Sequence, residues 1–203
     1  MNKLTIAIVD YGVGNHASVT HSLRSLGYRV IISKKKEDLN IADLLILPGV
    51  GAFPAAIKLL KQFDLFNYLQ LQASKKRPII GICLGMHLLA NASYEHTYTE
   101  GLGIIPGEVI KFNDNKFHIG WNTLKASTKD KVFKDFNDKQ FYFNHSYRYY
   151  GPDQYVRGLA ESTEIFPAII KYEKVIGVQF HPEKSQISGI NLLDSMIKGV
   201  VNA

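Results

Sequence analysis

The sequence predicts an α/β fold in which a central, mostly parallel sheet is flanked by helices and is followed by a β-rich C-terminal half. In the first hundred residues, short and wholly apolar runs alternate with stretches of helical periodicity. Strands that are apolar on both faces are typical of a parallel sheet covered by helices on each side. After about residue 101, helical periodicity nearly disappears and short β-rich segments follow, so we expect them to extend the first sheet and pack beside it.

The expected elements follow in chain order. Strands are predicted at residues 4–9, 29–32, 44–47 and 79–82, and helices at residues 16–26, 55–71 and 86–92. The β-rich half is expected to form strands at residues 108–112, 122–125, 140–144, 168–172 and 175–180, before a closing helix at residues 188–200. No repeat or Pro/Ser-rich linker divides the sequence, so we expect one domain over residues 1–203.

Length and composition exclude several classes of protein. The chain has 203 residues, of which 46% are hydrophobic and 21% charged, enough for a sizeable core and unlike a disordered segment. Its apolar runs are shorter than the roughly 20 residues that a membrane-spanning helix needs. The first apolar run carries one lysine and ends at Asp10, as expected of a first strand rather than a targeting peptide. We therefore expect a cytoplasmic protein with no membrane partner.

Charge and cysteine content narrow the choice of ligands. The net charge is +6, but the only tight basic runs, at residues 34–36 and 75–77, lie beside predicted strands rather than along one continuous stripe. Nucleic-acid binding is therefore not indicated. The single cysteine, Cys83, excludes a disulfide within the chain and a cysteine-based zinc site. No histidines stand at His-x-x-x-His spacing, so we expect no metal and no cofactor.

The most informative segment places Cys83 between two glycines, Gly81 and Gly85, where an apolar strand runs into a helix. This is the cysteine form of a nucleophile elbow, whose sharp turn leaves no room for side chains around a nucleophile held in a strained backbone conformation. The helix N-terminus favours the thiolate and leaves the N–H of Leu84 for a developing oxyanion. A lone cysteine is otherwise a core residue, so a nucleophile requires further support.

That support comes from His181 and Glu183, which follow a late predicted strand. His181 could take the thiol proton and later donate it to a leaving nitrogen. Glu183, two residues further on, could fix the imidazole tautomer through a hydrogen bond, although Pro182 indicates that the turn between them is not ordinary strand.

A second glycine-rich turn, Pro48-Gly49-Val50-Gly51, ends the strand at residues 44–47. In a parallel sheet it would lie at the same carboxyl edge as the elbow. Its glycines would allow a backbone N–H to point into the site as a second oxyanion donor.

These motifs, with those at residues 10–15, 118–122 and 143–147, resemble the class I (triad) glutamine amidotransferases over nearly the whole chain. Within that family they are similar to the glutaminase subunits of imidazole glycerol phosphate synthase. The resemblance implies the class I glutamine amidotransferase-like fold and a triad of Cys83, His181 and Glu183 that hydrolyses glutamine to glutamate and ammonia. It also implies a heterodimer with a β/α-barrel cyclase subunit, which receives the ammonia and forms imidazole glycerol phosphate and aminoimidazole carboxamide ribotide in histidine biosynthesis.

The resemblance also implies roles for other residues. The oxyanion hole would use Leu84, Val50 and Gly51; glutamine would contact Gly49, His87, His145, Ser146 and Tyr147; and the partner would contact Asn15, Trp121, Tyr142 and Lys184. Two positions depart from the family pattern, since His87 stands where a glutamine is usual and Phe117 stands where a proline is common.

Three alternatives stay open. Gly12, Gly14 and Ala17 fit a dinucleotide-binding fingerprint, but the second strand ends without the acidic ribose ligand. The departure at His87 allows a catalytically weakened, non-enzymatic partner subunit. The chain could also be a paralogous ammonia donor for another synthase, such as one in surface-sugar biosynthesis.

Overall fold

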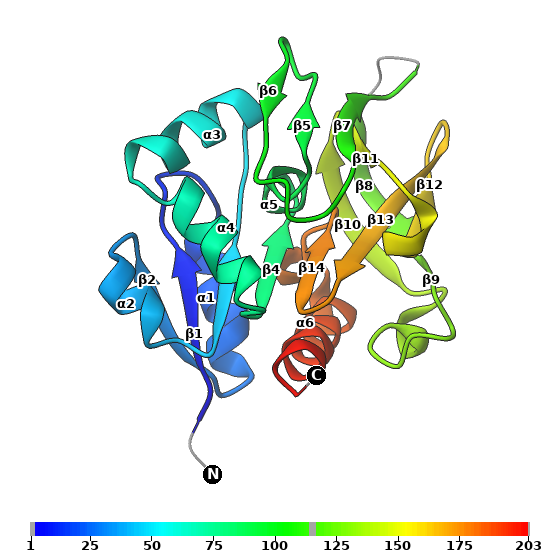
Figure 1. The fold of residues 1–203 in the computed structure, drawn as a ribbon. Helices are drawn as coiled ribbons and strands as arrows, with labels where there is room; N and C mark the ends of the chain where they lie inside the picture. The colour runs from blue at the N-terminus through cyan, green and yellow to red at the C-terminus, as the bar shows by residue number, and fades with distance from the viewer. Residues whose placement is uncertain (1–2, 114–116, 203) are drawn as a thin grey trace.

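The computed structural model, which describes residues 3–113 and 117–202, has the α/β architecture predicted from the sequence (Figure 1). The helices are α1 (His16–Ser25), α2 (Lys36–Asn40), α3 (Phe53–Gln62), α4 (Phe66–Ser74), α5 (Leu84–Leu88) and α6 (Gln186–Val201), with short 3-10 helices η1 (Lys134–Phe136), η2 (Asp153–Tyr155) and η3 (Pro182–Lys184). The strands of the first half are β1 (Thr5–Val9), β2 (Arg29–Ser33), β3 (Leu44–Leu47), β4 (Ile79–Ile82), β5 (Ala92–Ser93) and β6 (Thr99–Glu100). Those of the second half are β7 (Glu108–Lys111), β8 (His118–Thr123), β9 (Lys125–Ala126), β10 (Gln140–His145), β11 (Tyr147–Tyr150), β12 (Val156–Glu161), β13 (Ile165–Tyr172) and β14 (Val175–Val178).

The main sheet has eight strands in the order β2-β1-β3-β4-β14-β13-β12-β9. The first five are parallel to one another, and β13, β12 and β9 continue the sheet in antiparallel fashion. Two smaller sheets, β10-β8 and β11-β7-β5-β6, account for the remaining strands. The β-rich half therefore both extends the first sheet and packs beside it, as predicted.

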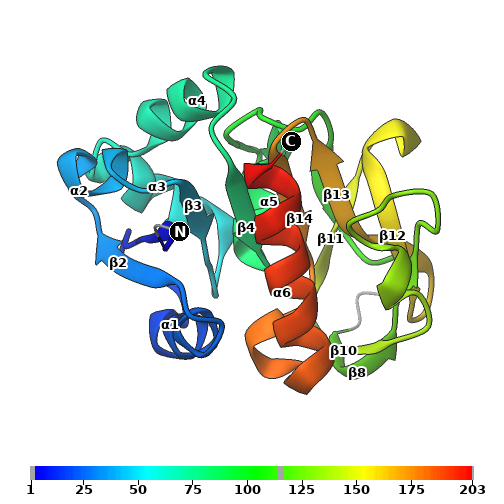
Figure 2. The same cartoon turned by 90° about the horizontal axis from the view of Figure 1, so that it is seen from below.

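Two hydrophobic cores cover the two faces of the parallel strands. Alternate residues of a strand point to opposite faces, so Ile6 and Ile8 pack with α1 and α6, whereas Ala7 and Val9 pack with α3 and α4. Figure 2 shows α1 and α6 on one side of the sheet and α3 and α4 on the other. Burial on both faces explains why these strands are continuous apolar runs.

The single helix expected at residues 55–71 is wrong, because the structure divides this segment into α3 and α4. Asp64 adopts a left-handed conformation, with φ 57°, between the two helices. The N–H of Phe63 still donates to Leu59, whereas that of Leu65 donates back to Leu60 and turns the chain. Apolar residues on both sides of the break enter the same core, so the hydrophobic pattern did not reveal it.

Other boundaries also differ from the prediction; β13 begins at Ile165 rather than at residue 168, and β14 ends at Val178 rather than at residue 180. The helix expected at residues 86–92 is α5, which ends at Leu88; Leu89 and Ala90 then donate three residues back before the chain enters β5. The strand expected at residues 122–125 is divided at the buried Leu124, because β8 pairs with β10 whereas β9 pairs with β12. The chain passes from one sheet to another at this residue.

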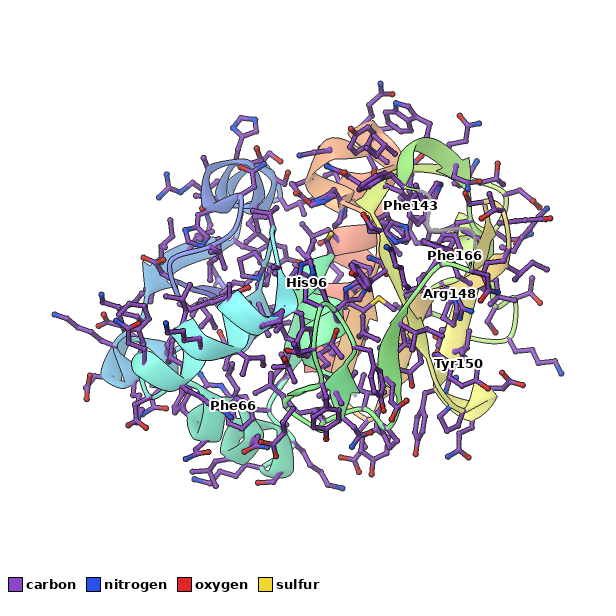
Figure 3. All side chains as sticks on the ribbon, turned by 90° about the horizontal axis from the view of Figure 1, so that it is seen from above. Phe66, His96, Phe143, Arg148, Tyr150 and Phe166 are labelled. Atoms are coloured by element: carbon purple, nitrogen blue, oxygen red, sulfur yellow. The ribbon has the colours of Figure 1, made fainter. Side chains whose placement is uncertain are left out.

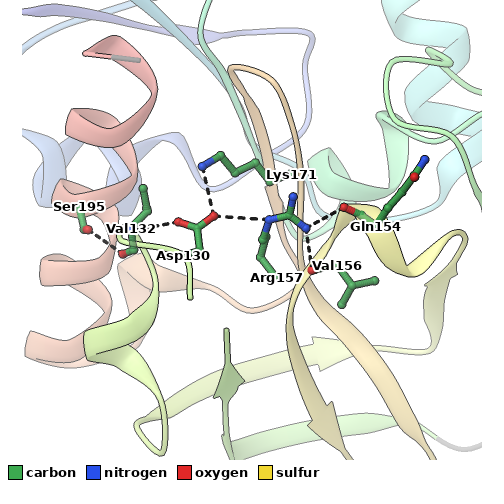
Figure 4. A network of polar contacts seen from close by, with 7 residues as sticks. All are labelled: Asp130, Val132, Gln154, Val156, Arg157, Lys171 and Ser195. Carbon is green, nitrogen blue, oxygen red and sulfur yellow. Dashed lines mark hydrogen bonds and ion pairs between the residues drawn. The ribbon is translucent and has the colours of Figure 1, made fainter. Parts of the chain in front are cut away.

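A polar network fastens the segment between β9 and β10 to the main sheet and α6 (Figure 4). Asp130 lies 3.2 Å from Lys171 of β13 and 3.4 Å from Arg157 of β12, and it accepts a hydrogen bond from the N–H of Val132. Ser195 of α6 donates a 2.8 Å hydrogen bond to the carbonyl of Val132. Ion pairs of this partly exposed kind contribute about 0–1 kcal/mol each, so the network mainly fixes where the segment lies.

The parallel strands point the same way, so the turns after β1, β3, β4 and β14 lie at one edge of the sheet (Figure 1). This is the edge at which open α/β sheets bind ligands. Within the part of the chain that the structure describes, no helix is both long and apolar enough to cross a bilayer.

Candidate active site

Cys83 lies at the sharp turn between β4 and α5. Its backbone has φ 53° and ψ −110°, a strained conformation for a residue with a side chain. A Cβ on Gly81 would come within 2.6 Å of the carbonyl oxygen of Gly85, and one on Gly85 within 1.8 Å of that of Leu47. The two glycines are therefore required by close backbone contacts, and the elbow geometry predicted from the sequence is confirmed.

The thiol of Cys83 is buried and faces β10. Its Sγ lies 3.8 Å from the carbonyl oxygen of Asn144, and its backbone N–H donates a 2.8 Å hydrogen bond to Val178 of β14. Leu84 is the first residue of α5, so the helix itself provides no acceptor for its N–H. The elbow thus presents a sulfur atom and an adjacent helical N–H group.

His181 and Glu183 form a hydrogen-bonded pair in the turn after β14. The Nδ1 of His181 donates to Oε1 of Glu183 over 2.8 Å, and the two side chains are only 3% and 1% exposed. Pro182 opens η3, a position that suits its fixed φ, and this short helix brings Glu183 back toward the imidazole. Because Nδ1 is occupied, Nε2 is the ring nitrogen left for chemistry.

The surroundings of His181 favour its protonated form. Burial acts to lower its pKa, but hydrogen bonds to Cys83 and Glu183, together with the charges of those two groups, outweigh burial and raise the pKa to about 10. An imidazolium therefore lies beside the sulfur at neutral pH. This is the arrangement that activates a cysteine nucleophile and supplies a proton to a leaving group.

A pocket of about 340 Å³ opens over these groups. It is lined by Val50, Gly51, Cys83, Leu84, His87, Glu95, Phe117, Ile119, Asn144, His145, Ser146, Tyr147 and His181. The structure thus brings together most of the catalytic, oxyanion and substrate-contact residues predicted from the sequence. Gly49 and Glu183 lie outside this lining, and Glu183 contacts His181 directly.

Gly49 is wedged between the elbow and the turn after β1. A Cβ at this position would come within 2.7 Å of the Tyr11 hydroxyl and 2.8 Å of Cβ of Leu84. The Tyr11 hydroxyl itself donates a 2.6 Å hydrogen bond to the carbonyl of Pro48. Gly51, two residues further on, has φ +99°, which favours glycine. The turn after β3 therefore lies directly against the first residue of α5.

His87 is buried in the pocket wall and is neutral. Its Nε2 donates a 2.6 Å hydrogen bond to Oε1 of Gln179. Burial lowers the pKa of His87 to about 4, because the hydrogen bond to Gln179 opposes burial only in part. With Nε2 donating, Nδ1 of the neutral ring is an acceptor.

His145 uses both ring nitrogens within the protein. Its Nδ1 donates to the carbonyl of Tyr147 over 2.8 Å, and its Nε2 accepts from Nδ1 of His118 over 2.9 Å. His118 in turn accepts from Asn122 over 3.0 Å. Burial is the main reason that the pKa of His145 is lowered, to about 3. Any contact of His145 with a ligand therefore falls to its backbone.

Aromatic side chains enclose these two histidines. Phe143 of β10 and Phe166 of β13 meet edge to face, with ring centroids 5.8 Å apart, and both rings contact His118 and His145 (Figure 3). The cluster joins the β10-β8 ribbon to the main sheet. It also keeps water from the histidine pair, which accounts for the lowered pKa values of both rings.

Three of the four residues assigned to a partner surface lie together. The rings of Trp121 and Tyr142 are 6.2 Å apart at 72°, and Nζ of Lys184 lies 5.9 Å from the Tyr142 ring. Asn15 is placed separately, at the N-terminus of α1, where its side chain accepts a hydrogen bond from the N–H of Ser18. Trp121 is 46% exposed, so this cluster faces solvent.

The sequence did not assign four lining residues to the site: Glu95, Phe117, Ile119 and Asn144. Phe117 was noted only as a departure from the family pattern. Ile119 and Asn144 belong to motifs quoted above, and their alternation with the buried His118 and His145 along two strands could have placed them on the pocket side. Glu95 had no such indication. Its Oε2 accepts a 2.8 Å hydrogen bond from the N–H of Phe53 at the start of α3, a contact between distant segments.

Comparisons with known proteins agree with this geometry. Residues 7–194 match the family described as "Glutamine amidotransferase class-I". The chain is 43% identical to the imidazole glycerol phosphate synthase subunit HisH of Carboxydothermus hydrogenoformans over 93% of this chain and 96% of that protein. It is 43% identical to the subunit of the same name from Lactococcus lactis, over 96% and 98%. It is also 40% identical to a Vibrio vulnificus protein named imidazole glycerol phosphate synthase subunit HisH 2, over 97% and 95%.

Solved structures show the same fold at low sequence identity. A structure of PurLQS from Thermotoga maritima superposes with a TM-score of 0.78 at 19% identity, covering 98% of this chain and 100% of that one. A crystal structure of a glutamine amidotransferase gives a TM-score of 0.76 at 18% identity, over 98% and 99%. With a family match that spans most of the sequence and relatives above 40% identity, this chain belongs to the class I glutamine amidotransferases.

Proposed function

We propose that this protein is the glutaminase subunit of an imidazole glycerol phosphate synthase, which releases ammonia from glutamine for histidine biosynthesis. The observation that carries the proposal is the pocket in which Cys83 sits on a strained elbow beside the imidazolium of His181, itself oriented by Glu183. Relatives of nearly equal length that carry this subunit name support the choice of pathway.

The first half-reaction forms a thioester. The sulfur of Cys83 bonds to the side-chain amide carbon of glutamine, and the carbonyl oxygen becomes an oxyanion. The carbon–nitrogen bond then breaks as Nε2 of His181 gives its proton to the departing nitrogen, which leaves as ammonia. Glu183 stabilises the imidazolium before this transfer and holds the ring afterwards.

The second half-reaction restores the enzyme. Neutral His181 takes a proton from water, whose oxygen attacks the thioester carbon and displaces the sulfur of Cys83. Glutamate leaves, and the starting ion pair forms again. Both tetrahedral intermediates carry an oxyanion, for which we assign the N–H of Leu84 and an N–H from Val50 or Gly51 as donors. Losing one such donor typically reduces the rate by about 10²–10³-fold.

Pocket residues beyond the triad suit an amino-acid substrate. The carboxylate of Glu95, whose side chain is 12% exposed, offers an anionic partner for the α-ammonium group of glutamine. His87 is assigned to the side-chain amide, with its Nδ1 accepting one N–H. Gly49, His145, Ser146 and Tyr147 are assigned to substrate contact, His145 through its backbone.

The released ammonia requires a synthase that consumes it. We assign this role to a β/α-barrel cyclase subunit that docks on Trp121, Tyr142 and Lys184, with Asn15 at the edge of the contact, and receives ammonia across the interface of a heterodimer. A single domain acting in the cytoplasm, with no nucleic-acid or membrane partner, fits this role. A second oxyanion donor that is correctly placed only in the complex would prevent idle hydrolysis, so we expect low activity without the partner.

A second candidate function is supported by the numbered relatives. Proteins named HisH 1 and HisH 2, from Campylobacter jejuni and Vibrio vulnificus, are each 40% identical to this chain. A number in the name indicates that a genome encodes more than one such subunit. One copy could then supply ammonia to a different synthase. The triad chemistry would be the same, and only the docking partner would differ.

One assay separates these readings. Glutamate release from glutamine is measured with and without the cyclase subunit from the same genome, with Cys83→Ala as the baseline. Release that depends on Cys83 and rises at least tenfold with the cyclase and its ribonucleotide substrate supports the histidine-pathway function. Glutamate release that depends on Cys83 but does not change when this cyclase is added supports the paralogous function. No release under either condition would contradict a glutaminase and favour a non-enzymatic subunit.

A further inference from the structure

The turn from His181 to Ser185 is docked on the free edge of β10 by a closed set of hydrogen bonds. The N–H of His181 donates to the carbonyl of Tyr142 over 2.9 Å, and the N–H of Tyr142 donates to Oγ of Ser185 over 2.9 Å. Oγ of Ser185 then donates to the carbonyl of His181 over 2.6 Å. The Ser185 hydroxyl thus connects the N–H of Tyr142 to the carbonyl of His181, while the carbonyl of Tyr142 is bonded directly to the N–H of His181.

Ser185 occupies a helix N-cap position, but its side chain does not cap the helix. It is the N-cap of α6, where a serine hydroxyl usually accepts a hydrogen bond from the helix and contributes about 1 kcal/mol. Here the side chain makes no capping bond. Its hydroxyl is directed back into the turn, and Ser185 is only 1% exposed.

Two neighbours of Ser185 are also unusual for a helix start. Gln186, the first residue of α6, has φ +51°, a left-handed conformation that strains a residue with a side chain. Gly189 lies inside the helix, and a Cβ on it would come within 2.0 Å of the carbonyl oxygen of Pro182. The missing cap at Ser185, the left-handed Gln186 and the glycine at position 189 each reduce the stability of α6 near this turn. Strained features of this kind persist only when the surrounding structure imposes them.

We propose that Ser185 is a positioning residue that holds the His181–Glu183 pair against Cys83. The proposal rests on the function argued above, because the pair matters only if His181 serves a cysteine nucleophile. Ser185 touches no reacting atom. It acts by fixing the backbone of His181, and the backbone position determines where the imidazole lies.

Removing the hydroxyl should loosen this turn. The N–H of Tyr142 would lose its acceptor at a part-buried site, and the buried carbonyl of His181 would lose one of its two donors and keep only the N–H of Lys184. The titratable groups around His181 are Cys83 from the elbow, Glu183 from the same turn and His145 from β10. Of these, Cys83 and Glu183 make the contacts that keep the imidazole protonated, so a shift of the turn weakens those contacts first.

The experiment compares Ser185→Ala with Ser195→Ala in the full chain with its cyclase partner. Ser195 is a matched control, because its hydroxyl also donates to a backbone carbonyl from α6, at Val132, away from the pocket (Figure 4). Three measurements are made: steady-state kinetics for glutamine, which give kcat and KM; the alkaline limb of the kcat/KM profile; and the rate of Cys83 alkylation by iodoacetamide at pH 7. Thermal melting of each variant accompanies these measurements.

For Ser185→Ala we expect kcat to fall about tenfold with KM within about twofold, the alkaline limb to move about one pH unit lower, and alkylation to slow about fivefold. Ser195→Ala should stay within about twofold of the parent chain in all three. An unchanged alkaline limb together with unchanged alkylation in Ser185→Ala overturns the proposal, whatever its melting temperature.

Two results would leave the first experiment ambiguous, and each has a further measurement that resolves it. If Ser185→Ala does not fold, Gly189→Ala displaces the same turn while keeping the hydroxyl, and the same shifts are expected; a folded Gly189→Ala with the parent's alkaline limb and alkylation rate overturns the proposal. If the parent chain releases no glutamate, the proposed function fails. The alkylation rates still decide whether Ser185 holds His181 against Cys83, since alkylation needs no substrate.

Discussion

His87 donates a hydrogen bond to Gln179 inside the pocket wall, with the two side chains 2.6 Å apart at their polar atoms. Both residues are buried, and Nε2 of Gln179 has no hydrogen-bond partner among the described residues. The wall therefore contains an amide with an unused donor, next to a histidine that offers a ligand one ring nitrogen. We therefore expect this pair to influence how well the pocket holds the amide group of a substrate.

Replacing His87 by glutamine should improve glutamine binding. A planar amide offers a donor and an acceptor together, whereas the neutral imidazole has only Nδ1 left. One added hydrogen bond is worth about 0.5–1.5 kcal/mol, so we expect KM for glutamine to fall about three- to tenfold in His87→Gln. Steady-state glutaminase assays measure this, with His21→Gln on the exposed face of α1 as the control. A raised KM would show that His87 is the better ligand in this pocket.

Glu183→Gln should reduce turnover far more than substrate affinity. The substitution keeps the shape of the side chain but removes the charge that stabilises the His181 imidazolium across their 2.8 Å hydrogen bond. We expect kcat to drop about 10²-fold or more, with a small change in KM. Glu37→Gln, at an exposed position on α2, is the matched control. Activity within tenfold of the parent would remove Glu183 from the triad.

The pH dependence of activity should follow His181. Its pKa is raised to about 10, so the protonated form persists through neutral pH and is lost as pH rises through that value. We expect kcat/KM to hold between about pH 8 and 9 and to fall on an alkaline limb centred near 10. The stability that His181 contributes is complete below about pH 6.5, its unfolded value, and decreases as pH rises from there to 10. A limb centred near pH 7 would indicate that the imidazole is not paired.

Stability should decrease in mild acid because of His87 and His145. Their pKa values are lowered by burial to about 4 and about 3, below the unfolded value of about 6.5. Below pH 6.5 the unfolded chain therefore binds more protons, and the free energy of unfolding falls as pH drops toward 4. At pH 5 each histidine should account for about 1–2 kcal/mol of this loss. Urea unfolding of His87→Gln between pH 5 and 7 should show a shallower pH slope than the parent; an equal slope would exclude His87 as a source.

Trp121 should be a main contributor to partner binding. It is 46% exposed and stacks edge to face on Tyr142, as an aromatic anchor for a docking surface would. We expect Trp121→Ala to weaken binding of the cyclase subunit at least about tenfold in titration calorimetry. Tyr172→Ala replaces an aromatic residue of similar exposure at the end of β13, next to the turn into β14, and it should leave the affinity unchanged. Equal loss in both variants would argue against a specific surface around Trp121.

The parts of the site that depend on residues close together in the sequence could be predicted. Gly81 and Gly85 identify the elbow because backbone contacts around Cys83 exclude side chains at both positions. His181 and Glu183 are two residues apart, so one short turn suffices to pair them. The apolar strands were predictable for a similar reason, since burial on both faces leaves a continuous hydrophobic run.

Features that depend on contacts between distant segments were not predictable. Glu95 enters the pocket because its carboxylate binds the N–H of Phe53, and neither segment indicates the other. Asp64 divides α3 from α4 by one left-handed residue, although the apolar pattern continues across it. Ser185 has the sequence position of a helix cap, and only the position of Tyr142 shows that its hydroxyl is used elsewhere.

The register of β8 against β10 limits how this protein can change in length. Tyr142 pairs with Trp121 and His145 pairs with His118, so one face of the ribbon carries an exposed Trp121 beside a half-buried Tyr142, and the other carries a buried histidine pair. A one-residue insertion or deletion within β8 would shift the register on one side of the change and turn those side chains to the other face, which would expose His118 or bury Trp121. We therefore expect substitutions on the exposed face to be tolerated away from the pocket and the Trp121 surface, while gain or loss of residues is tolerated only in the connections at the ends of the ribbon.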